Sequence, residues 1–364
     1  MKSVTFYIVV FLVLYSILTI TNFSQQKDSI ESNEFDWYAV PIVFYTPETD
    51  LSLGALAMIL FRLTDQLNSR PSSTRFVGYY TLNSQYSFAI KPEIYFNDDK
   101  NLLQSDFSYS KIIDKYYGLG NDTEEIDNPD YEARSFLLGA KFQSQIFPNF
   151  RAGLIYEFSY AKIIDAKENP YLNSGSVTAS DGGINSGLGL AVSYDSRDKL
   201  FYPESGGYYE FSSVFFNSVI GSDFSYTKTL FDFRRFHKVG SNQVVAFQFF
   251  YNFIIGSAPF YDVPPLGGED IMRGYFRGRY RDNHYFAAQL EYRLRFWWKF
   301  GAVGFIGVGD VASRLTKFEL KKFKYSYGAG LRFRIDDAEL IDLRADLGFG
   351  KGTFEVYFSY NQSF

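Results

Sequence analysis

The chain has 364 residues, no cysteine and a formal net charge of −5 at pH 7. The acidic balance argues against a nucleic-acid-binding protein, which carries a basic surface, and the missing cysteines exclude disulfides and thiolate nucleophiles. Aromatic residues make up 20% of the sequence, including 30 tyrosines and 40 phenylalanines. Because aromatic side chains fit the pleated surface of a sheet, this composition favours β-strands.

The first 24 residues have the layout of a secretory signal peptide. Lys2 supplies a positive end, residues 5–20 form an almost unbroken apolar run, and polar residues follow at 22–26. The run is shorter than the roughly 20 apolar residues that a membrane-spanning helix needs, so a cleaved signal is favoured over an uncleaved anchor. We therefore predict a signal peptide over residues 1–24 and a short periplasmic linker over residues 25–35.

From residue 36 onward, apolar and polar residues alternate with a period of two. In IDLRADLGF (341–349) the apolar residues fall on one face, and Asp342, Arg344 and Asp346 fall on the other. Long segments of this kind, with aromatic residues at their ends and charges in their middle, are typical of a transmembrane barrel, whose outer face meets lipid and whose inner face lines a lumen. A soluble sandwich is the alternative, but its strands are usually about five or six residues long.

We therefore predict an all-β protein, a transmembrane antiparallel β-barrel of about sixteen strands over residues 36–364. The predicted strands are 36–46, 51–63, 72–83, 85–97, 101–114, 131–147, 149–163, 185–197, 206–218, 224–239, 242–256, 283–297, 300–312, 323–335, 340–350 and 353–364. The long connections (115–130, 164–184, 257–282 and 313–322) all follow odd-numbered strands. Because such barrels have short periplasmic turns and long outer loops, both chain ends are expected in the periplasm.

The turn after the eighth predicted strand is rich in charge and glycine. The candidate residues in this segment are Tyr194, Asp195, Arg197, Asp198, Pro203 and Gly206. One interpretation is a salt-bridged turn closed by the proline and the glycines. The other is a contact, in the lumen or at the turn, that positions the barrel.

The sixth outer loop contains the run GGEDIMRGYFRGRYRDN (267–283), with four arginines, three acidic residues and four glycines. Its glycines permit a doubled-back main chain, and Arg273 offers a guanidinium that can bind a carboxylate through two hydrogen bonds. A loop folded into the lumen would meet carboxylates at Glu291, Asp342 and Asp346. A solvated outer loop is the alternative, and the spacing alone does not separate the two.

Four segments resemble a known family. IMRGY (271–275) resembles the V-R-G-[FY] signature of the BamA/TamA family of surface-antigen barrels, and YDSRDKLFYPESGGYYEF (194–211) resembles its Y-D-x-R-D…P-x-x-G-x-Y segment. GFIGVGDV (304–311) is similar to the family's F-x-D-x-G-x-V strand. The aromatic C-terminal segment, with Phe358, Tyr360 and Phe364, resembles the signal read by the barrel assembly machinery. The likeness extends over about residues 36–364.

The resemblance implies a sixteen-stranded barrel with the sixth outer loop folded into the lumen. In the family the loop arginine is held by lumen carboxylates, which implies a latch of Arg273, Gly274, Tyr275 and Glu291, with Asp310 a weaker candidate because of its strand parity. Family members usually carry periplasmic polypeptide-transport-associated domains before the barrel, and we expect none here. The family's F-x-D aspartate is replaced by Gly307, so the latch is expected to be looser or differently anchored.

The resemblance also implies a protein of the bacterial outer membrane that inserts proteins into that membrane or translocates them across it. Its expected partners are the lipid bilayer, client outer-membrane or secreted proteins and a separate periplasmic protein. A passive pore or uptake channel is the alternative. We expect no enzyme, cofactor or metal: residues 121–130 lack the order of a calcium loop, and no G-x-S-x-G motif accompanies the two histidines.

Overall fold

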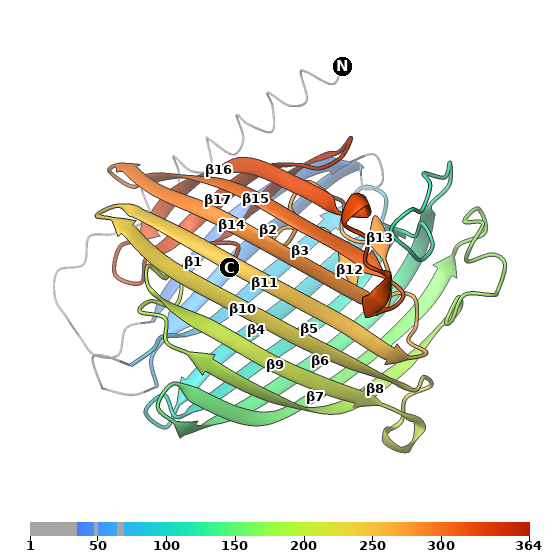
Figure 1. Ribbon diagram of the computed structural model, residues 1–364, viewed down its shortest axis with the longest axis horizontal. Helices are drawn as coiled ribbons and strands as arrows, with labels where there is room; N and C mark the ends of the chain where they lie inside the picture. The colour runs from blue at the N-terminus through green and yellow to red at the C-terminus, as the bar shows by residue number, and fades with distance from the viewer. Residues whose placement is uncertain (1–34, 47–49, 64–68) are drawn as a thin grey trace.

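A computed structural model describes residues 35–46, 50–63 and 69–364, in which nearly all regular secondary structure is β-strand (Figure 1). Sixteen strands form one antiparallel sheet, and their order in the sheet follows the chain. They are β1 (Asp36–Thr46), β2 (Asp50–Phe61), β3 (Ser72–Thr81), β4 (Tyr86–Phe96), β5 (Asn101–Lys115), β6 (Asp130–Phe147), β7 (Phe150–Asp165), β8 (Gly182–Asp195), β9 (Gly206–Phe216), β10 (Tyr226–Gly240), β11 (Gln243–Gly256), β14 (His284–Trp297), β15 (Phe300–Ala312), β16 (Lys324–Asp336), β17 (Ile341–Phe349) and β18 (Phe354–Tyr360). The predicted fold class and strand number are confirmed.

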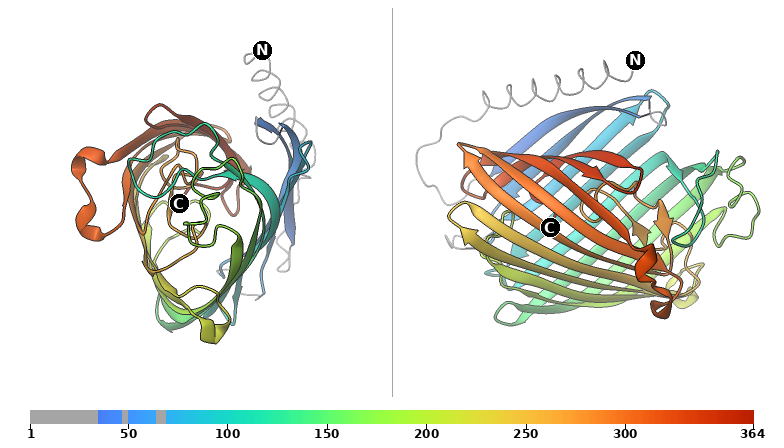
Figure 2. Two further views of the ribbon diagram at one scale, coloured as in Figure 1. Left: turned by 90° about the vertical axis from the view of Figure 1, so that its right-hand side faces the viewer. Right: turned by 45° about the horizontal axis from the view of Figure 1, so that its top comes forward.

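The sheet curves into a ring, and several loops cross the end of the ring that is viewed in the left panel of Figure 2. Two short strands, β12 (Pro265–Leu266) and β13 (Tyr280–Arg281), pair within the sixth long loop. Three short 3-10 helices lie in other connections: η1 (Ser218–Ile220), η2 (Leu315–Lys317) and η3 (Leu320–Lys322). In the part of the chain that the structure describes, no helix is long and apolar enough to cross a membrane. The predicted signal peptide and the linker up to residue 34 lie outside the described residues.

The two faces of the sheet differ in the way that a lipid-embedded ring requires. On β14, Leu290 and Tyr292 point outward and are 40% and 41% exposed, whereas Glu291 and Arg293 point inward and are at most 1% exposed. Apolar side chains therefore cover the outside, and charged side chains are packed in the lumen. The predicted alternation on this strand is the one that the structure shows.

The last strand ends earlier than predicted. β18 stops at Tyr360 instead of residue 364, because Asn361 adopts a left-handed backbone with a φ of +64°. The chain then enters the ring, where its end lies in the left panel of Figure 2. We call residues 361–364 the tail. Its polar side chains Gln362 and Ser363 are at most 9% exposed, so they leave the sheet for polar partners in the lumen.

The two ends of the sheet meet by overlap. Tyr360 shares the strand parity of Phe358, which is 41% exposed on the outer face, yet Tyr360 is only 6% exposed. Its hydroxyl donates to the main-chain oxygen of Leu56 on β2, at 3.2 Å. Its ring belongs to a buried cluster that includes Met58 and Leu60 of β2. At the end of β18, the face that elsewhere on this strand meets lipid therefore packs against the β1–β2 hairpin.

The family resemblance also implies that the first and last strands, about residues 36–46 and 353–364, pair weakly along a seam. Here the two ends of the sheet overlap at that seam. Among the described residues, the strand that pairs with β1 is β2. Side chains make the connection across the seam: Arg62, after β2, pairs with Glu339 before β17, and the Tyr38 hydroxyl donates to Asp336 at the end of β16. These contacts hold the ring at the end that carries the short turns.

The orientation can be tested with single cysteines, because the chain has none of its own. Val219, in a connection assigned to the outside, is 91% exposed, and the Asp337 side chain, in a turn assigned to the periplasm, is 73% exposed. A membrane-impermeant maleimide added to intact cells should label Val219→Cys and not Asp337→Cys. Permeabilised cells, in which both should react, are the control. Labelling of Asp337→Cys alone in intact cells would reverse the assignment.

Candidate functional site: an arginine latch in the lumen

The sixth long loop folds back into the ring and becomes part of its core. Met272 has a φ of +56° and Gly274 a φ of +107°, so the main chain reverses on both sides of Arg273. Met272, Arg273 and Tyr275 are at most 1% exposed. The loop therefore presents a buried guanidinium to the inner wall.

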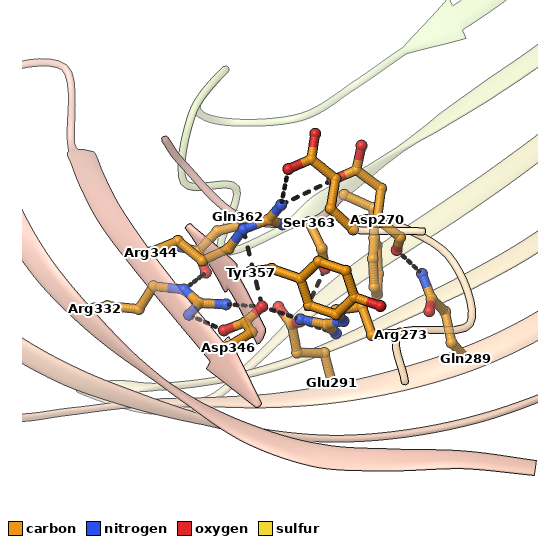
Figure 3. Close-up of polar contacts among 12 residues, drawn as sticks. Asp270, Arg273, Gln289, Glu291, Arg332, Arg344, Asp346, Tyr357, Gln362 and Ser363 are labelled. Atoms are coloured by element: carbon orange, nitrogen blue, oxygen red, sulfur yellow. Dashed lines mark hydrogen bonds and ion pairs between the residues drawn. The ribbon is translucent and has the colours of Figure 1, made fainter. Parts of the chain in front are cut away.

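Two buried carboxylates from different strands hold this guanidinium (Figure 3). Nη2 of Arg273 donates to Oε2 of Glu291 on β14 at 2.7 Å, and Nη1 donates to Oδ2 of Asp346 on β17. The ring of Phe305 on β15 lies under the guanidinium, with its centroid 3.5 Å from Cζ. Charge-assisted hydrogen bonds hold the two terminal nitrogens of the group, and an aromatic ring covers its face. We call Arg273, Glu291, Asp346 and Phe305 the arginine latch.

Glycines allow the loop to reach the wall closely enough for the latch to form. A Cβ on Gly274 would lie 2.4 Å from the carbonyl carbon of Phe349, and a Cβ on Gly348 would lie 2.7 Å from the Gly274 nitrogen. The Gly274 N–H donates to the Tyr357 hydroxyl at 3.0 Å, and its carbonyl accepts from the Thr353 hydroxyl at 2.6 Å. The loop is therefore bonded to β18 and to the turn that leads into it.

Tyr275 also attaches the loop to β16. Its hydroxyl donates to the Tyr325 carbonyl on β16 and accepts from the Lys351 N–H in the β17–β18 turn, both at 3.0 Å. The latch and its flanking residues thus connect the loop to β14, β16, β17 and β18. Three of these are the last strands before the seam.

The tail is part of the same polar network (Figure 3). The Ser363 hydroxyl donates to Glu291 at 3.0 Å, and Arg332, which also pairs with Asp346, donates to Gln362 at 2.9 Å. The two carboxylates that hold the loop therefore also hold the tail: Glu291 accepts from Ser363 directly, and Asp346 pairs with Arg332, which donates to Gln362.

The end of the tail reaches β10 and β11, the two strands that precede β14 in the sheet. Arg293 donates to Glu291 at 2.7 Å and to the main-chain oxygen of Phe364 at 2.8 Å. The Phe364 ring packs in a buried cluster with Phe236 of β10 and Ala246 of β11. Arg293 thereby connects the latch carboxylate Glu291 with the end of the tail.

A second charged group fixes the turn between β8 and β9. Arg197 donates to Asp195 through Nε at 2.9 Å and Nη2 at 2.8 Å, and Arg70 also pairs with Asp195. Burial disfavours the charge on Arg197, but Asp195 outweighs this effect, so the pKa of the guanidinium is raised. The carboxylate of Asp198 accepts main-chain N–H groups of Glu204 at 3.0 Å and of Ser205 at 3.1 Å. The turn is closed on itself by these contacts.

The remaining predicted residues of this segment complete the turn. Pro203 is buried, and Gly206 has a φ of +87° with a Cβ position only 1.9 Å from the Ser196 oxygen. Tyr194 is 40% exposed on the outer face and stacks on Tyr209. This geometry fits the interpretation as a salt-bridged turn.

The structure brings together Arg273, Gly274, Tyr275 and Glu291, and it keeps Asp310 apart. Asp310 is buried beside a different loop, where Asn121 donates to it at 3.0 Å. A function for these residues stays a prediction. Sequence reasoning did not identify Gly348, Tyr357, Arg332 or the tail as neighbours of the loop, because their contacts join strands that are distant in the chain.

Comparison with known proteins decides the family. A model described as the Omp85 superfamily domain matches residues 69–364. The chain belongs to the Omp85 superfamily. It is therefore an outer-membrane β-barrel protein, as predicted from its motifs. No protein of the curated set matches it.

Two solved structures of similar fold extend this result. The crystal structure of BamA from Haemophilus ducreyi lacking POTRA domains 1–3 has a TM-score of 0.56 and 15% identity, covering 90% of this chain and 69% of that one. CdiB from Acinetobacter baumannii has a TM-score of 0.56 and 13% identity, covering 92% of this chain and 60% of that one. This Omp85 chain thus spans less than two thirds of CdiB. At such identities the likeness concerns the fold.

The Omp85 latch of this chain has both carboxylates despite the glycine at position 307. Asp346 supplies the second one from β17. A Cβ on Gly307 would lie 2.9 Å from the Ser326 hydroxyl and 3.3 Å from the sulfur of Met272, so Met272 occupies the space that a side chain at 307 would need. In this chain Asp346 takes the place of a carboxylate at position 307 in binding Arg273.

Removing the latch arginine should destabilise the barrel. Arg273→Ala removes the donor that Glu291 and Asp346 share, but Arg293 and Arg332 still pair with them, so the loss should be smaller than the roughly 3–5 kcal/mol of a buried charge left without any partner. We expect a lower urea midpoint for unfolding from lipid vesicles, and trypsin cleavage of the loop in intact cells. Arg314→Ala, at an exposed position, is the control. An unchanged midpoint for Arg273→Ala would contradict the latch.

Restoring the family aspartate should weaken this protein. Gly307→Asp must displace Met272 or Ser326, and overpacking a filled site costs about 1–3 kcal/mol. Gly304→Ala on the same strand is the matched control, because a Cβ there has no atom within 4 Å among the described residues. The free energies of unfolding in vesicles should fall for the first variant only. Equal or greater stability of Gly307→Asp would show that Met272 does not fill the position.

Proposed function

We propose that this Omp85 protein inserts polypeptide strands into the outer membrane or passes polypeptide across it, and that the overlap between β18 and the β1–β2 hairpin is where a strand enters. The supporting observation is the position of Tyr360. By parity it belongs to the lipid face, yet it is buried and bonded to Leu56 on β2. Sheet ends held by side chains can separate without breaking a continuous ladder.

The chemistry of such a site is that of an exposed sheet edge. A strand edge offers main-chain donors and acceptors in a row, and an incoming chain adds to it as one more strand. The bilayer core makes this addition favourable, because unpaired main-chain groups cost several kcal/mol in hydrocarbon. β1, once separated from β18, supplies that edge on the lipid side.

The arginine latch supports this function by fixing the other side of the seam. Gly274 is bonded to Tyr357 on β18 and to Thr353 before it. Arg273 itself pairs with Asp346 on β17, the neighbour of β18. Holding β17 and β18 while β1 and β2 move gives the opening a fixed wall and a mobile one.

A passive pore or uptake channel is the second candidate from the sequence. It requires an open lumen. In the described residues the sixth loop, the β8–β9 turn and the tail all occupy the lumen. These contacts favour strand insertion or translocation over free diffusion through the ring.

A crosslinking experiment tests the proposal. Ala39 on β1 is exposed on the lipid face, and Phe231 is exposed to 40% on β10, a strand paired on both edges. A stalled barrel client with one cysteine in its last strand should form a disulfide with Ala39→Cys severalfold more than with Phe231→Cys.

Equal adducts at the two positions would contradict entry at the seam. A large, steady conductance of the intact protein in planar bilayers, combined with equal adducts, would favour the pore instead. Protein without the client supplies the background level in both measurements.

A further inference from the structure

The turn between β8 and β9 reaches from its own strands to the seam. Its polar residues are tied together, since Asp198 accepts three main-chain N–H groups, from Lys199, Glu204 and Ser205. Between these tethers, Leu200, Phe201 and Tyr202 have no strand partners. Phe201 is 9% exposed and Tyr202 is 4% exposed, so this connection is packed against the barrel and does not project into solvent.

Phe201 packs in a cluster that draws its residues from both sides of the seam. It shares one buried hydrophobic cluster with Met58 and Leu60 of β2, with Ile341 of β17 and with Tyr360 of β18. Partly buried residues packed against this cluster come from β1, β2, β16, β17 and the turn itself: Tyr38, Val40, Leu56, Leu200, Ile335 and Leu343. The cluster lies where Tyr360 crosses onto the β1–β2 hairpin.

Tyr202, the next residue, anchors the turn to the inner faces of β14 and β16. Its ring lies close to three guanidiniums, with centroid distances of 5.8 Å to Arg293, 5.0 Å to Arg295 and 5.2 Å to Arg334. Such cation–π contacts are strong where water is excluded. Because Arg293 also binds Glu291 of the latch, the turn is attached to the fixed side of the seam.

We propose that the β8–β9 turn is an internal lock on the seam, in which Phe201 is a positioning residue that holds the β1–β2 hairpin over β18. The anchored neighbour Tyr202 keeps the turn in place, and Phe201 fills the junction of the two walls. Separation of β1 from β18 then requires that Phe201 leave the cluster. This inference rests on the proposed function only for its purpose, since the lock itself is a property of the empty barrel.

The lock gives the charged motif of residues 194–211 a specific task. The ion pairs of Asp195 and the glycine at 206 fix the base of the turn, so that an apolar tip can be placed across the lumen end. A simple hairpin turn would need neither the buried Phe201 nor three arginines around Tyr202. A segment of a client or partner that draws this tip away would release the seam.

Distance measurements between spin labels test the lock. Ala55 on β2 and Val356 on β18 both face lipid and lie outside the cluster, and the chain has no natural cysteine to interfere. The labelled protein in lipid vesicles should give one narrow distance distribution. In Phe201→Ala a second population should appear at a separation larger by about 5 Å, one strand spacing. Phe201→Leu should lie between the two.

The control removes an equally buried aromatic ring elsewhere. Phe260 is 2% exposed in a cluster with Tyr116, Tyr131 and Leu172 at the outer loops, and Phe260→Ala should leave the label distances unchanged. Folding of every variant is checked by its heat-dependent mobility in gels. If Phe201→Ala does not fold, Phe201→Leu serves as the test, with a smaller broadening expected.

Two outcomes overturn the lock: an unchanged distribution in the folded Phe201 variant, or an equal broadening in Phe260→Ala. The measurement uses no client, so it separates the two hypotheses. A wider seam without client adducts at position 39 supports the lock and contradicts strand insertion. Adducts at position 39 with an unchanged distribution contradict the lock alone.

Discussion

The structure depends on one buried ion pair network, in which the Arg273 guanidinium is shared by Glu291 and Asp346. A charge cannot be taken out of water without a compensating partner, and the partners here are on β14 and β17. The loop that carries the arginine must therefore enter the ring, and it must come within hydrogen-bonding distance of two strands at once. The glycines at 274 and 348 follow from this demand, because side chains at either position would separate loop and wall.

Because of this network, the two sides of the seam are held in different ways. β17 and β18 are bonded to the loop, and through Glu291 and Arg332 to the tail. β1 and β2 meet them through side chains: a tyrosine hydroxyl, an ion pair and a hydrophobic cluster. Proteins in which one wall is fixed and the other is held by side-chain contacts can open locally without losing the rest of the sheet.

Much of this architecture could be predicted from the sequence, and the limits have a physical cause. Alternation of apolar and polar residues predicted the strands, because successive residues of a strand face lipid and lumen in turn. The inward loop and its first partner, Glu291, were indicated by the resemblance and by strand parity. Asp346 as the second carboxylate was not assigned, because it depends on register between strands that are not neighbours. The tail was predicted as strand, since a left-handed Asn361 leaves no mark on the alternation.

The burial of the final aromatic residues has a consequence for how this protein itself is made. Phe364 and Tyr360 were predicted to form part of the signal that barrel-assembly factors read, and in the folded protein they are 5% and 6% exposed. Any factor that binds them can do so only while the chain is unfolded. If these residues serve as that signal, folding removes them from reach, and a finished barrel would not compete with newly made chains for the factor that binds them.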